Sequence, residues 1–121
     1  MKNFIRLTAR AGRIALDARV IRAGADIQCV LTGGGGHIGA VALAQPSPAG
    51  VQSLILSLPG HREDELALRM ALVMAKTLNH AICVSAGIHF DNITREEIAA
   101  VLRLTDELTE RCLKSISRRK G

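Results

Sequence analysis

The apolar residues of this chain change their spacing once, at Pro59 and Gly60, and this change limits the folds that the chain can adopt. Before that point, the apolar residues form short runs, most of which alternate with polar residues, as is typical of β-strands. After it, apolar residues recur every three or four positions, which is typical of α-helices. The sequence therefore predicts a sheet built early in the chain and helices placed late.

The predicted strands are short and closely connected. We place them at residues 14–23, 26–32, 38–44, 51–58 and 81–86. A turn at residues 23–25 predicts a hairpin, and two prolines predict a loop at residues 45–50. The early connections are too short for crossover helices, so antiparallel pairing is expected. The runs 51–58 and 81–86 lack alternation, which predicts strands in the interior of the sheet.

Two helices are predicted, at residues 62–79 and 94–117. The first carries Glu63, Asp64 and Glu65 near its start, where the helix dipole favours negative charge. The second opens with Thr-Arg-Glu-Glu, a capping box in which the Thr94 hydroxyl and the Glu97 carboxylate would each accept a backbone N–H.

This order, β-β-β-β-α-β-α, predicts an α+β fold: a mostly antiparallel sheet of about five strands with two helices, in a single domain over residues 1–121. Apolar residues make up 48% of the chain, enough to fill one core. The helices would cover one face of the sheet. The other face needs a partner, which is a reason to expect a homodimer.

Composition argues against two classes of partner. No stretch reaches the roughly 18 uncharged apolar residues of a membrane helix, and residues 1–7 lack the features of a secretory signal, so we expect a cytoplasmic protein. The net charge of +5 would suit nucleic acid. However, Phe4 and Phe90 are the only aromatic residues, and single-stranded nucleic acid is usually bound by stacking on aromatic rings. We expect no nucleic acid and no membrane partner.

The three cysteines are Cys29, Cys83 and Cys112. They are odd in number, show no C-x-x-C spacing and lie in apolar or amphipathic stretches. We expect buried free thiols.

Three of the four histidines lie in glycine-containing loops, each of which follows a predicted strand. These loops are GGGGHIG around His37, PGHRED around His61 and GIHFDN around His89. Loops at strand ends commonly carry binding residues. The fourth, His80, ends the first helix, where a positive side chain meets the helix dipole.

The loops suit several kinds of chemistry. The run from Gly33 to Gly36 could form an anion-binding nest or a plain hairpin loop, and His61 with Arg62 could add positive charge at the start of the first helix. Asp64 could orient a histidine. A metal held by the three loop histidines with Asp64 or Asp91 is an alternative, although no short-range ligand spacing supports it.

In this order, the segments GGGGHIG, PGHREDELA and GIHFDNITREEI resemble the LpdD-like family of prenylated-flavin chaperones. The resemblance covers nearly the whole chain. It implies a dimer, similar in fold to the proteasome assembly chaperones, that holds reduced prenylated FMN made by a UbiX-type flavin prenyltransferase. The cofactor would then be handed to a UbiD-type decarboxylase. On this reading the protein is not itself an enzyme.

The resemblance also implies a binding site in the loops. The flavin phosphate would meet Gly34, Gly35, Gly36, His37, His61 and Arg62. Polar edges of the ring or the ribityl chain would meet His89, Asp91 and Asn92. Flavin rings are often stacked on aromatic residues, which are scarce here, so aliphatic side chains or a partner subunit would have to cover the ring. Two alternatives remain open: a small histidine-dependent enzyme acting on a phosphorylated metabolite, and an assembly chaperone for proteins alone.

Overall fold

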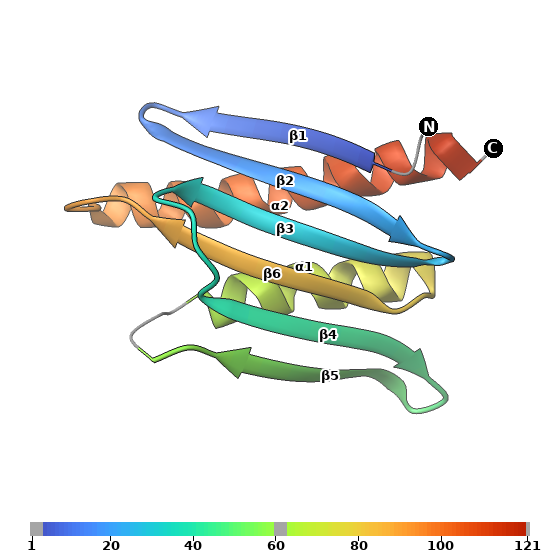
Figure 1. Ribbon diagram of the computed structural model, residues 1–121. Coiled ribbons are helices and arrows are strands. Elements are labelled where there is room, and N and C mark those ends of the chain that lie inside the picture. The colour runs from blue at the N-terminus through green and yellow to red at the C-terminus, as the bar shows by residue number, and fades with distance from the viewer. Residues whose placement is uncertain (1–3, 60–62, 121) are drawn as a thin grey trace.

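A computed structural model describes residues 4–59 and 63–120 of the chain, and it has an α+β fold. Two helices, α1 (Asp64–Leu78) and α2 (Arg95–Lys120), pack against the same face of one mixed sheet, and the opposite face is open (Figure 1). The strands of the sheet are β1 (Phe4–Ala11), β2 (Ile14–Ala23), β3 (Asp26–Gly34), β4 (Ala40–Ser47), β5 (Gly50–Ser57) and β6 (Ile82–His89).

The strand order, β1-β2-β3-β6-β4-β5, places the last strand in the middle of the sheet. β6 runs parallel to β3 and antiparallel to β4, and all the other pairs are antiparallel. Because β6 separates β3 from β4, the short connection of residues 35–39 must cross the end of β6. This crossing positions much of the candidate site.

The core lies between the sheet and the two helices. The alternating pattern of β2 buries Ile14, Leu16, Ala18 and Val20 on the helix side. Small residues let α1 approach the sheet closely, because its alanines face alanines of the central strands. The fully buried or nearly buried alanines of this layer are Ala40, Ala42, Ala44, Ala67, Ala71, Ala75 and Ala86.

Local signals at the helix ends match the prediction. The amide of Glu97 donates to the Thr94 hydroxyl (3.1 Å), and the Thr94 amide donates to the Glu97 carboxylate (3.0 Å), which confirms the capping box. α1 ends at Asn79, whose amide donates to the Ala75 carbonyl and whose left-handed backbone (φ 58°) turns the chain out of the helix.

Three parts of the predicted architecture were wrong. The sheet has a further strand, β1, which raises the number of described strands from about five to six. Residues 51–58 were expected in the interior, but β5 is an edge strand. The predicted loop at residues 45–50 is shorter, because β4 continues through Pro46 to Ser47.

The three cysteines are free, as predicted. Cys29 and Cys112 are buried, and burial raises the pKa of the Cys112 thiol to about 11. The expectation of burial was wrong for Cys83, which is half-buried because it points from β6 toward the open face of the sheet.

Candidate functional site

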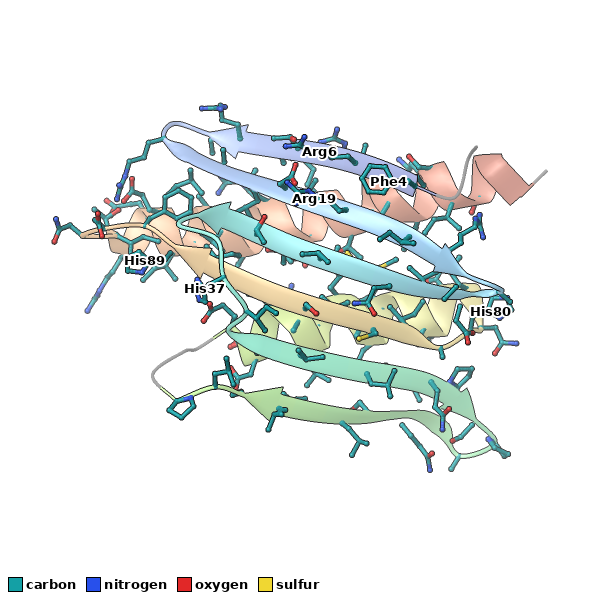
Figure 2. All side chains as sticks on the ribbon, in the orientation of Figure 1. Phe4, Arg6, Arg19, His37, His80 and His89 are labelled. Atoms are coloured by element: carbon teal, nitrogen blue, oxygen red, sulfur yellow. The ribbon has the colours of Figure 1, made fainter. Side chains whose placement is uncertain are left out.

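Residues from the three histidine loops lie at one end of the sheet. β3 and β6 are parallel, so the segments that follow them leave the sheet at the same edge. Figure 2 shows His37 and His89 at this end and His80 at the opposite end. The segment that joins β5 to α1 also arrives here, because the Leu58 amide donates to the Gly39 carbonyl (2.8 Å). His61 and Arg62 lie outside the described residues.

The connection between β3 and β4 crosses β6 directly over Gly87. A methyl group on the α-carbon of Gly87 would overlap the backbone carbonyl of His37. The Gly39 amide donates to the Ala86 carbonyl (2.9 Å), which fastens the far end of the connection. Only glycine fits beneath so close a backbone. Gly87 is therefore a site residue that sequence reasoning missed, although its place before His89 was visible.

Gly34, at the end of β3, and Gly35, just after it, allow the chain to cross close to β6. Gly34 has a left-handed backbone (φ 63°), and a side chain there would also overlap the His89 carbonyl. The Gly35 amide donates to the same carbonyl (2.9 Å). The Gly35 amide is therefore already hydrogen-bonded within the protein. Fewer amides of the run from Gly33 to Gly36 remain to bind an anion.

His37 is held between two oxygen acceptors. Its Nδ1 lies 3.0 Å from the Gly35 carbonyl, and its Nε2 lies 2.6 Å from Oε2 of Glu63. The Ile88 amide donates to the same carboxylate oxygen (3.1 Å). The Glu63 carboxylate thus continues the hydrogen bonding of β6 beyond Ala86, where the pairing with the start of β4 stops.

Glu63 is buried, with 7% of its surface exposed, although acidic residues are seldom buried without partners. The sequence had suggested that it merely favours the dipole of α1. The structure places it against His37, while Oδ1 of Asp64 accepts the Glu65 amide (2.9 Å). In the sequence, only the position of Glu63 two residues after His61 pointed to a role in the site. Its contact with His37 depends on the fold.

His89, Asp91 and Asn92 form the outer part of the site. Nε2 of His89 lies 3.0 Å from Oδ1 of Asp91, and both side chains are exposed. Asn92 has a left-handed backbone (φ 52°), which turns the chain toward α2. We call residues 35–39, Glu63 and residues 87–92 the loop cluster.

A clamp holds the loop cluster to the rest of the molecule. Arg13, in the turn between β1 and β2, bonds the Glu97 carboxylate (2.7 and 2.9 Å) and the Asp91 carbonyl (2.8 Å). Its guanidinium also lies over the Phe90 ring, 5.8 Å from the centroid. The hydrogen bond from Arg13 is the main reason that the pKa of Glu97 falls to about 2.

The sequence matches the model of the prenylated flavin chaperone LpdD-like domain over residues 10–117. The chain belongs to this family. It is 32% identical over 93 residues to Protein LpdD of Lactiplantibacillus plantarum (strain ATCC BAA-793 / NCIMB 8826 / WCFS1), an alignment that covers 74% of this chain and 68% of that protein. Membership supports a chaperone role toward prenylated flavin.

The fold of this family member is shared with a solved structure described as a novel chaperone complex for yeast 20S proteasome assembly. The TM-score is 0.66 at 16% sequence identity, and the superposition covers 98% of this chain and 97% of the other. This likeness confirms the expected proteasome-assembly-chaperone-like fold.

In the residues that the structure describes, no group of three or more His, Cys, Asp or Glu side chains is placed to hold a metal ion. The same residues contain no helix long and apolar enough to cross a membrane.

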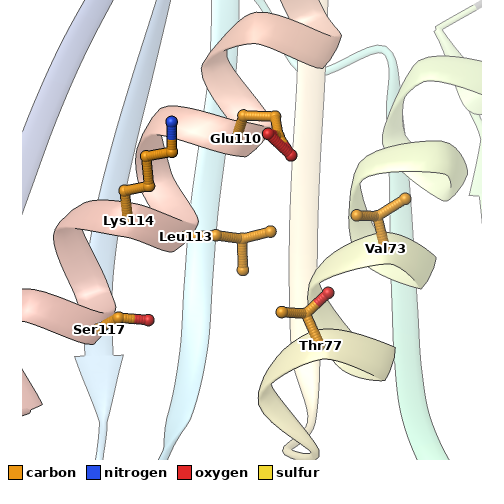
Figure 3. Close-up of a pocket in the computed structure, with 6 residues that line it drawn as sticks. All are labelled: Val73, Thr77, Glu110, Leu113, Lys114 and Ser117. Carbon is orange, nitrogen blue, oxygen red and sulfur yellow. The ribbon is translucent and has the colours of Figure 1, made fainter.

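A groove of about 520 Å³ between α1 and α2 shares no residue with the loop cluster (Figure 3). Its lining residues are Val73, Thr77, Glu110, Leu113, Lys114 and Ser117.

Proposed function

We propose that this protein binds reduced prenylated FMN and delivers it to a UbiD-type decarboxylase, as a carrier that does not itself catalyse a reaction. The observation that carries the proposal is the loop cluster, in which the crossing connection, Glu63 and the end of β6 meet in a chain of the prenylated-flavin chaperone family. The cofactor would come from a UbiX-type prenyltransferase. The whole chain would act as one domain in the cytoplasm.

The phosphate of the cofactor would be bound by the inner part of the loop cluster. Gly36 and His37 lie on the crossing connection, after Gly34 at the end of β3 and Gly35, whose amide already bonds the His89 carbonyl. His61 with Arg62 immediately precede Glu63 in the sequence. A phosphate suits such a set, because imidazole, guanidinium and backbone N–H groups all donate hydrogen bonds to its oxygens.

Polar groups of the ribityl chain or the ring would be bound by the outer part. His89, at the end of β6, and Asp91 and Asn92, just after it, are exposed, so a ligand can reach them without opening the core. Asp64, the first residue of α1, would act in the site by orienting a histidine. A carrier must release its cargo, and an exposed site is compatible with release.

We also propose that the protein is a homodimer and that β4 and β5 form its interface. No residue from 38 to 59 is charged, and β5 is an edge strand that pairs on one side with β4, with Leu54 and Leu56 exposed by 74% and 69%. Edge strands are normally protected by charges, because bare edges pair with other chains. A hollow beside Leu43 and Leu54 continues the same uncharged surface.

The proposed function is tested by anaerobic titration of the protein with reduced prenylated FMN, followed by transfer to an apo-decarboxylase of the UbiD type. Oxidised FMN serves as a control for binding of any flavin, and inorganic phosphate as a control for binding of any anion. Selective binding and recovered decarboxylation are expected. Absence of binding, or turnover of phosphorylated metabolites by the protein alone, would overturn the proposal.

A further inference from the structure

A second cavity, of about 420 Å³, opens between the first turns of α1 and α2. Small-molecule sites typically have volumes of about 300–1,000 Å³. Most of the lining is aliphatic, from Leu66, Ile88, Ile93, Ile98, Val101 and Leu102. Glu63 and Glu65 complete it. We call this cavity the aliphatic pocket.

The aliphatic pocket adjoins the loop cluster through two shared residues. Glu63 lines the pocket and also contacts His37 (2.6 Å), and Ile88 lines the pocket while its amide bonds Glu63 (3.1 Å). Ile88 also lies between Gly87, which supports the crossing connection, and His89. A ligand bound at the loop cluster therefore has the pocket immediately beside it.

The lining determines which part of a ligand the pocket can take. Among the described lining residues none is basic, and two are acidic, so a phosphate group would be disfavoured. None is aromatic either, so the pocket offers no ring on which a flavin could stack. Its side chains suit an uncharged aliphatic group, because burial of apolar surface is the favourable interaction they provide.

We propose, resting on the proposed function, that the aliphatic pocket receives the prenyl-derived ring of reduced prenylated FMN while the phosphate stays at the loop cluster. That ring is the aliphatic part of the cofactor, and it is what distinguishes prenylated FMN from FMN. The pocket is thus the part of the site that selects the prenylated cofactor. It also covers this portion of the ligand without the aromatic residues that the chain lacks.

The test compares two variants at helix positions of similar exposure. Ile98→Asp places a charge at the pocket, where Ile98 is 49% exposed, and Val73→Asp places one in the groove of Figure 3, where Val73 is 44% exposed. Both variants are titrated anaerobically with reduced prenylated FMN and with reduced FMN. Ile98→Asp should bind the prenylated cofactor about tenfold more weakly, the loss of roughly two buried methylene groups. Its affinity for reduced FMN should change much less, and Val73→Asp should match the wild type with both ligands.

The outcomes distinguish a wrong pocket assignment from a wrong proposed function. If the wild type binds the prenylated cofactor and Ile98→Asp binds it equally well, the pocket assignment is wrong while the proposed function stands. Equal weakening toward both ligands would also overturn it, because selection of the prenyl-derived ring predicts a difference. If the wild type binds neither ligand, the proposed function itself fails. Should circular dichroism show that Ile98→Asp is unfolded, Ile98→Ala is used with the same expected loss of selectivity.

Discussion

The backbone carbonyl of His37 lies so close over the α-carbon of Gly87 that no side chain fits between them. This contact exists because β6 is inserted between β3 and β4, which forces the five-residue connection to cross it. The glycine before His89 is therefore as much a part of the loop cluster as the histidines, although it carries no chemical group of its own.

Gly87→Ala should lower the free energy of unfolding by about 1–3 kcal/mol, because the added methyl group displaces the crossing connection. Urea denaturation measures the change. Gly35→Ala is the control for stability, since a methyl group there would make only ordinary contacts with His89. Equal stability of the Gly87→Ala variant and the wild type would show that the crossing connection leaves room for a methyl group at Gly87.

Glu63→Ala should lower the free energy of unfolding by about 1–3 kcal/mol, because the Ile88 amide and His37 lose a buried acceptor. Glu63→Gln should cost less, since its amide oxygen can still accept the Ile88 N–H. Both variants should bind the flavin more weakly if Glu63 positions His37. The exposed Glu65→Ala should change stability by no more than about 0.5 kcal/mol. A Glu63→Ala variant as stable as Glu65→Ala would contradict the role of Glu63 as a buried acceptor for Ile88 and His37.

Local patterns were sufficient for most of the fold. β2 and β3 alternate clearly, and the Thr94 and Glu97 capping box fixes the start of α2, because these features depend on neighbouring residues alone. β1 also alternates, but two of its four inward residues, Ala9 and Ala11, are small and make the apolar pattern weak.

Features set by distant parts of the chain could not be predicted. The apolar run of β5 suits a central strand equally well, and its edge position follows from the insertion of β6. Glu63 shows the same limit at the site. In sequence it is an acid at a helix start, and only the crossing connection brings His37 to it.

Acid should weaken the clamp between Arg13 and Glu97. The pKa of Glu97 is lowered from 4.5 to about 2, so in the unfolded chain it binds its proton at higher pH than in the folded chain. Its stabilising contribution is complete above pH 4.5 and is lost as the pH falls toward 2. The stability difference between the wild type and Glu97→Gln should therefore shrink over this range. Urea denaturation at several pH values measures it, with the exposed Glu96→Gln as control. A difference independent of pH would contradict the ion pair.

Thiol reagents should modify Cys83 before the other two cysteines. Burial raises the pKa of both Cys29 and Cys112, so at neutral pH these remain protonated and shielded, whereas Cys83 lies half-buried on the open face. Reaction with a disulfide reagent at pH 7.5 should show one fast thiol per chain, and Cys83→Ser should remove it. Three equal rates would mean that the core opens readily.

Charged substitutions in β5 should separate the proposed dimer. Leu54 and Leu56 lie on an edge strand, on a surface with no charge between residues 38 and 59. Lysine at both positions therefore brings like charges together when two β5 strands pair about a twofold axis near these residues. Sedimentation should show a dimer for the wild type and a monomer for Leu54→Lys/Leu56→Lys. Val73→Lys, at an exposed apolar residue of α1 on the other face of the sheet, should remain a dimer. A dimer that persists with both lysines would place the interface elsewhere, and a monomeric wild type would overturn the proposed homodimer.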